Sequence, residues 1–150
     1  MLKKIILFAA LPLPVLIFIF LKLFGKNEFE VPVYWSDGVN VAGCKSQPAP
    51  YVLPDSALNA WGWKGDKATL IVLGGNDIKD NLARVADLFE KDDYTTIRVS
   101  NVPTCLLLAG DSSKVVMVDN ERQIRGYYTP TNRKETDRLA VELRILLKQY

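Results

Sequence analysis

The stretch that decides the fold runs from Ala68 to Phe89 and has the sequence ATLIVLGGNDIKDNLARVADLF. Residues 68–73 form an unbroken apolar and β-branched run, which is typical of a strand buried on both faces. Gly74 and Gly75 then break the run. After them, apolar residues recur at the spacing of one helix face, at Leu82, Val85, Ala86 and Phe89. The stretch therefore predicts a strand, a glycine turn and a helix.

The residues that follow extend this unit into a sheet. Thr95–Val99 is a second β-branched run, so strand, helix and strand form a βαβ unit with a parallel pairing. Leu106–Leu108 and Val115–Val118 are further candidate strands. A turn at Asp119–Arg122 leads into a return strand at Gln123–Tyr128, which predicts a hairpin.

The two ends of the soluble part are less regular. A last helix is predicted over Lys134–Lys148, with Thr131 or Asn132 as its cap. Upstream, Phe29–Trp35 alternates like a short strand, residues 36–54 have the composition of a loop, and residues 61–66 suggest a turn between short strands. The order of elements predicts an α/β fold with a thioredoxin-like mixed sheet and flanking helices.

The N-terminal segment predicts a membrane anchor. Ile5–Phe24 is a run of 20 residues interrupted by one charge, Lys22, and a membrane-spanning helix needs about 20 apolar residues. No small-residue cleavage site follows the run. Lys3 and Lys4 precede it, so the N-terminus is expected in the cytoplasm. We therefore expect an anchor at 1–27, a lipid contact through Ile5–Phe24, and a domain at 28–150 on the periplasmic side of the inner membrane.

Charge and composition exclude several functions. Four of the 19 basic residues precede Asn27 and all 17 acidic residues follow it, so the soluble part carries 15 basic and 17 acidic groups. With this formal charge of −2, the soluble part has no basic surface that could bind the phosphates of a nucleic acid. The chain has no histidine. That absence rules out a His-ligated zinc site and a Ser-His or Cys-His dyad.

The C-terminal hairpin resembles one known family. Residues 112–128, SSKVVMVDNERQIRGYY, are similar to the corresponding stretch of the Sco/SenC family, which are membrane-anchored thioredoxin-fold copper chaperones of cytochrome oxidase assembly. Weaker similarity extends over about two thirds of the chain, at residues 24–27, 31–34, 81–85, 136–139 and 142–147. The resemblance implies a thioredoxin-like domain outside the cytoplasm and a protein partner in respiratory oxidase assembly.

The chain departs from the family at the residues that carry its chemistry. The family binds copper through a C-x-x-x-C motif after the first core strand and a histidine just before the hairpin, which are soft ligands suited to copper. The corresponding positions here are Gly74, Gly75, Asn76 and Asp77 for the motif and Asp111 for the histidine. Compared with the family, the chain also lacks several tens of residues between Val99 and Leu106. The resemblance therefore implies a pseudo-chaperone without copper or another cofactor, which acts by binding and is not an enzyme.

The two cysteines, Cys44 and Cys105, leave three alternatives. We expect two unreactive thiols, with Cys105 at the start of a buried strand. A disulfide is the second alternative if the compartment is oxidising. The third is a functional pair, which would make the protein a residual thiol oxidoreductase or a copper carrier.

Other features have a functional and an ordinary interpretation. Pro103 resembles the cis-proline of thioredoxins, although a trans proline at the start of a strand is the expectation. Asp77, Asp80 and Asp111 could hold calcium if they met, but solvated carboxylates are expected. The aromatic residues of the N-terminal region fit a partner surface or core packing equally well, namely Tyr34, Trp35, Tyr51, Trp61 and Trp63.

Overall fold

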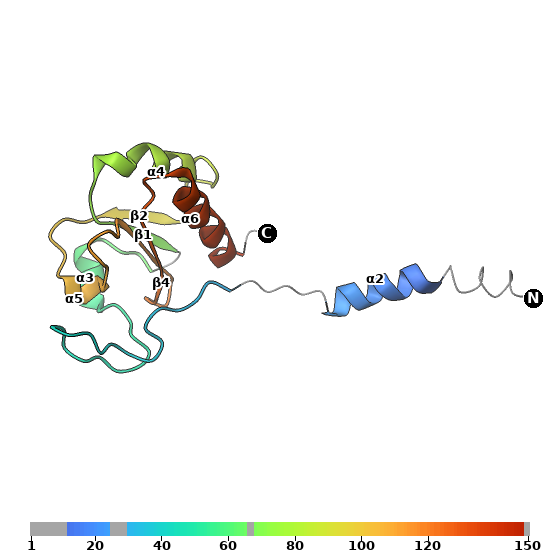
Figure 1. Ribbon diagram of the computed structural model, residues 1–150, viewed down its shortest axis with the longest axis horizontal. Helices are drawn as coiled ribbons and strands as arrows, with labels where there is room; N and C mark the ends of the chain where they lie inside the picture. Colours follow the sequence, from blue (N-terminus) through green and yellow to red (C-terminus); the bar gives the residue numbers. More distant parts are fainter. Residues whose placement is uncertain (1–11, 25–29, 66–67, 149–150) are drawn as a thin grey trace, which may run out of the picture.

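The protein is described from a computed structural model that covers residues 12–24, 30–65 and 68–148. Its centre is a four-stranded mixed sheet in the order β2-β1-β3-β4 (Figure 1). The strands are β1 (Thr69–Val72), β2 (Thr95–Arg98), β3 (Val115–Val118) and β4 (Ile124–Tyr128). β1 pairs parallel with β2 and antiparallel with β3, and β3 pairs antiparallel with β4.

The predicted βαβ unit and the hairpin are confirmed. The connection from β1 to β2 contains a single 3₁₀ turn, η1 (Asn76–Ile78), and the helix α4 (Lys79–Ala86). The parallel register begins with Thr69 opposite Thr95. The mixed α/β architecture expected from the sequence is therefore present.

The sheet is covered on both faces, so its side chains enter two separate cores. Leu70 and Val72 of β1 lie in the core beneath α4 and α6 (Arg133–Leu146). Ile71 lies in the core beneath the short helices α3 (Asp55–Ala60) and α5 (Thr104–Leu107). Every residue of β1 is buried, which is why the strand has no polar alternation. Each such apolar side chain contributes about 1.5–3 kcal/mol to the free energy of unfolding.

The last helix begins at its predicted cap. The side-chain carbonyl of Asn132 accepts a hydrogen bond of 3.0 Å from the backbone N–H of Glu135. This bond satisfies one of the N–H groups that a helix start leaves without a partner. Leu139 and Leu143 on the inner face of α6 are fully buried against the sheet.

Leu106–Leu108 is not a strand, contrary to the expectation from its apolar run. Residues 104–107 form the helical turn α5, and Leu108 ends it in the left-handed region with φ of 53°. Tertiary hydrogen bonds hold this turn. The hydroxyls of Tyr51 and Tyr127 donate to the carbonyl oxygens of residues 106 and 107, at 2.7 and 2.8 Å.

The expected strand at Phe29–Trp35 is also wrong where the structure describes it. Residues 30–35 contain no strand, and Tyr34 donates one backbone hydrogen bond to the carbonyl of Ile124 on β4. Pro32 has no N–H to donate, and Trp35 turns the chain with φ of 62°. The turn after residue 60 follows helix α3 and does not join two strands.

Helix α2 (Pro12–Phe24) covers the second part of the predicted anchor. Its large apolar side chains from Leu13 to Phe20 are exposed. The beginning of the predicted span, residues 5–11, lies outside the described residues. Within the ranges that the structure describes, no helix has both the length and the hydropathy that a membrane crossing requires.

Candidate functional site

A pocket of about 260 Å³ lies beyond the carboxyl ends of the two parallel strands. Leu73 follows β1 and Val99 follows β2, and the rest of the lining comes from the segment around α5. That segment contributes Asn101, Val102, Pro103, Thr104, Leu107, Ala109 and Gly110. The carboxyl ends of parallel strands are where open α/β sheets commonly bind ligands. Apolar side chains such as Leu73, Val102 and Leu107 share the lining with polar groups, so the pocket fits an apolar side chain flanked by hydrogen-bonding groups.

The two glycines after β1, Gly74 and Gly75, have a structural role. Gly74 and Gly75 adopt φ of 115° and 96° between β1 and η1. A Cβ atom on Gly75 would collide with the carboxylate of Asp77. Glycine is therefore required at position 75 on two counts, the positive φ and the close carboxylate.

Asp77 is engaged in an ion pair with Lys114, the residue just before β3. The hydrogen bond from the Lys114 ammonium is the largest cause that lowers the pKa of the Asp77 carboxyl below its ordinary value of 3.8. Asp111, which the resemblance places at the histidine position, is exposed in the turn after α5. In the part of the chain that the structure describes, no three Asp, Glu, Cys or His side chains lie close enough to hold a metal ion.

Cys44 and Cys105 form a disulfide, with their Cα atoms 5.4 Å apart. The expectation of two unpaired thiols depended on a buried strand at Cys105. Cys105 lies instead on α5 and is exposed, and Cys44 is a half-buried residue of the mostly exposed loop before α3. The bond therefore fastens that loop to the helix that forms one wall of the pocket.

Pro103 lines the pocket and precedes α5. The peptide bond between Val102 and Pro103 is trans. Among the described residues, the one cis peptide bond joins Ala49 and Pro50. The thioredoxin-like cis-proline considered for Pro103 is therefore absent from the structure.

The aromatic residues of the N-terminal region mostly pack inward. Tyr51 is buried, and Trp35, Trp61 and Trp63 pack against the core beneath α3 and α5. Trp35 Nε1 donates to the Tyr127 hydroxyl at 2.8 Å, and burial raises the pKa of that hydroxyl to about 12. Core packing therefore accounts for most of these side chains, and Tyr34 remains the more exposed one.

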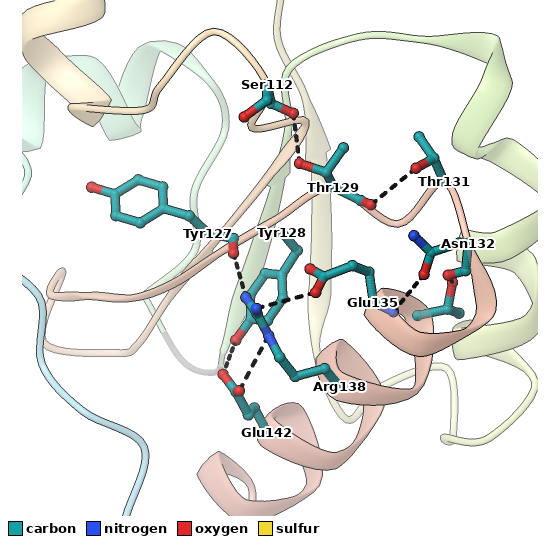
Figure 2. Close-up of polar contacts among 10 residues, drawn as sticks. Ser112, Tyr127, Tyr128, Thr129, Thr131, Asn132, Glu135, Arg138 and Glu142 are labelled. Carbon is teal, nitrogen blue, oxygen red and sulfur yellow. Dashed lines mark hydrogen bonds and ion pairs between the residues drawn. The ribbon is translucent and has the colours of Figure 1, made fainter.

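Sequence reasoning missed a polar cluster that joins β4 to α6 (Figure 2). The Tyr128 hydroxyl donates to Glu142 Oε2 at 2.5 Å, and Arg138 lies over the Tyr128 ring at 4.7 Å from its centroid. Arg138 also donates to the carbonyl of Tyr127 at 2.6 Å. Burial raises the pKa of Tyr128 far above its ordinary value. The i,i+4 spacing of Arg138 and Glu142 was the sequence signal that could have predicted their ion pair. The cluster stabilises the packing of α6 on β4, and α6 contributes no residue to the pocket lining.

We predict that replacing Cys44 and Cys105 with alanine lowers the free energy of unfolding by about 2–4 kcal/mol. The bond spans 61 positions, so its loss frees a long loop in the unfolded chain. Urea unfolding of the full chain in detergent, followed by tryptophan fluorescence, measures the change. Reductant should destabilise the wild-type protein and leave the double variant unchanged; an equal effect on both would contradict the prediction.

We predict that the Asp77 carboxyl titrates below pH 3.8 and that Lys114→Ala moves its midpoint back toward that value. Because the folded pKa is lowered, the ion pair stabilises the fold above pH 3.8, and the contribution is lost as the pH falls through the folded pKa. A carboxyl-carbon NMR titration measures both midpoints. Lys114→Arg, which keeps a cation at the position that pairs with Asp77, is the matched control and should leave the Asp77 midpoint low.

Comparisons with known proteins do not identify a family or a function for this chain. No family model, no curated protein and no solved structure matches the sequence or the fold. The pocket, the motif corner at Gly74–Asp77 and the disulfide are therefore interpreted from their own chemistry.

Proposed function

We propose that this chain is a membrane-anchored, thioredoxin-like protein related to the Sco/SenC family that acts by binding and not by catalysis. The sheet supports this proposal. Two parallel strands joined through α4, followed by an antiparallel hairpin and a closing helix, form the order expected for the second half of a thioredoxin-like domain. The sequence similarity of residues 112–128 lies in that hairpin and the turn before it.

The observation that carries the proposal is the chemistry of the motif corner. Thiol exchange and copper(I) transfer both need thiolates. The corner instead offers two glycines, an amide and a carboxylate that is already paired with Lys114. These hard or occupied groups do not fit copper(I), and the sulfurs of both cysteines are used in one disulfide elsewhere.

The disulfide and the N-terminal segment together support a location outside the cytoplasm. Disulfides persist in oxidising compartments and are rare in the cytosol. The apolar run at Ile5–Phe24, with Lys3 and Lys4 before it, would place the domain on that side of the inner membrane. In this proposal the protein is a single-pass membrane protein with a periplasmic domain.

The pocket supplies the proposed contact. Its lining combines apolar side chains with polar groups, and Leu73 in the lining directly precedes the motif corner at Gly74–Asp77. By family analogy, the partner is a subunit of a respiratory oxidase during assembly. An apolar side chain of that subunit would fill the space between Leu73, Val102 and Leu107. Binding would then depend on burial of that side chain and on hydrogen bonds to polar lining groups such as Asn101 and Thr104.

We predict that Val102→Asp abolishes binding to the oxidase, because the bound apolar side chain would desolvate the new carboxylate without supplying a partner for it. Val141→Asp is the matched control, since Val141 is exposed on α6, which contributes nothing to the pocket lining. The full chain is captured from native membranes after crosslinking, and the haem spectrum of the captured material is recorded. Haem retained by wild type and Val141→Asp but lost with Val102→Asp supports the proposal; no haem with the wild type contradicts it.

A second function is favoured by one observation. Cys105 is exposed, and its neighbours Pro103 and Thr104 line the pocket. A dithiol of another protein could therefore approach the disulfide there. The protein would be reduced to two thiols while the attacking dithiol became a disulfide, and the resulting thiols could carry copper(I).

Thiol and copper(I) titrations of the purified full chain separate the two functions. For a binding protein we expect no reactive thiol before reduction and no tight 1:1 copper(I) complex after it. The Cys44→Ala/Cys105→Ala variant is the baseline for both titrations. A tight copper complex that this variant loses, or rapid exchange with a dithiol reductant, would establish the second function instead.

A further inference from the structure

The sheet has one covered edge and one open edge. On the β4 side, the backbone N–H of Tyr34 donates to the carbonyl of Ile124 at 2.8 Å. β2 is the last strand on the other side. Among the described residues, β2 has no backbone hydrogen bond to any segment other than its β1 neighbour. Its outer donors and acceptors are therefore available for another strand.

The direction of the paired groups shows which residues face outward. The N–H groups of Thr95 and Val99 donate to the carbonyls of Ala68 and Val72 on the β1 side, at 2.9 and 3.0 Å. Backbone groups alternate in direction along a strand. The N–H and C=O groups of Thr96 and Arg98 therefore point away from the sheet, and both side chains are exposed.

We infer that β2 pairs antiparallel with β2 of a second copy of this chain, about a two-fold axis at Thr96. This register places the two Thr96 residues opposite each other and sets Arg98 opposite the second copy's Tyr94. Threonine pairs and cation–aromatic contacts are both favourable across strands. The two sheets would then form one continuous sheet through an isologous interface.

The charges around β2 favour a second copy as the occupant. Asp92 precedes the strand and Arg98 ends it, and neither has an ionic partner in the described chain. An antiparallel pairing brings the acidic start of one strand beside the basic end of the other. A parallel pairing would place the two Arg98 residues side by side. The charges at the two ends of β2 are thus complementary to those of a second β2 that runs in the opposite direction.

β2 is short and carries the charge of Arg98, two features that weaken edge pairing. Other protected edges carry a proline or a bulge. β2 contains neither, and its register with β1 is unbroken over the whole strand. An edge of four residues buries less than the ~800 Å² per partner of a typical stable interface, so the dimer is weak in solution. Two copies held in one membrane would pair more readily because their effective concentration is higher.

The test uses one cysteine at the proposed axis. In the full chain in membranes, Thr96→Cys should form an intermolecular disulfide under mild oxidation, because residues opposite each other in this pairing have Cα atoms about 5.5 Å apart. Arg98→Cys is the matched control. The two copies of residue 98 would lie about 13 Å apart, which is too far for a disulfide. We expect crosslinking at position 96 to be at least about tenfold faster than at position 98.

Charge reversal checks the orientation independently. In the Thr96→Cys background, Arg98→Glu should slow crosslinking, and adding Asp92→Arg should restore it. Peptide mapping must show that Cys44 and Cys105 remain joined in each variant. Equal crosslinking at positions 96 and 98, none at 96, or Thr96→Cys crosslinked only to a different protein would overturn the self-pairing. Binding to the oxidase can succeed or fail independently of this result.

Discussion

The burial of β1 on both faces is the constraint on which the rest of the structure depends. Leu70 and Val72 occupy one core and Ile71 the other, so neither layer of helices can be removed without exposing this strand. A strand with no polar alternation is unstable at a sheet edge. It must therefore pair on both sides, and it does so with β2 and β3. The carboxyl end of this fixed strand positions Leu73 and the glycine corner.

Local sequence patterns predict the elements whose stability is itself local. The βαβ unit, the hairpin and the cap at Asn132 follow from periodicity, turn residues and side-chain chemistry within a few positions. Helix α5 is different, because distant hydroxyls hold it. Tyr51 and Tyr127 donate to its carbonyls from segments far away in the sequence. No window around residues 104–107 contains that information.

The same reasoning explains which parts of the candidate site were foreseen. The motif corner at Gly74–Asp77 lies where the strand–turn–helix pattern predicts. The pairing of Asp77 with Lys114 was not foreseen, because it joins the turn after β1 to the start of β3. The state of Cys105 depended on assigning its segment to a strand, and a helix turns the side chain outward. The wrong prediction of two unpaired thiols therefore came from assigning the segment between β2 and β3 to a strand.

The corner supports the proposal that the protein acts by binding and not by catalysis. Gly75 cannot accept a side chain without displacing the Asp77 carboxylate, and that carboxylate holds Lys114 at the start of β3. Restoring a cysteine there would disturb both the turn and the ion pair. The residues of the corner therefore hold the loop after β1 in place. The neighbouring pocket is lined by the residues that follow β1 and β2 and by the segment around α5, so a partner could occupy it without a change in the corner.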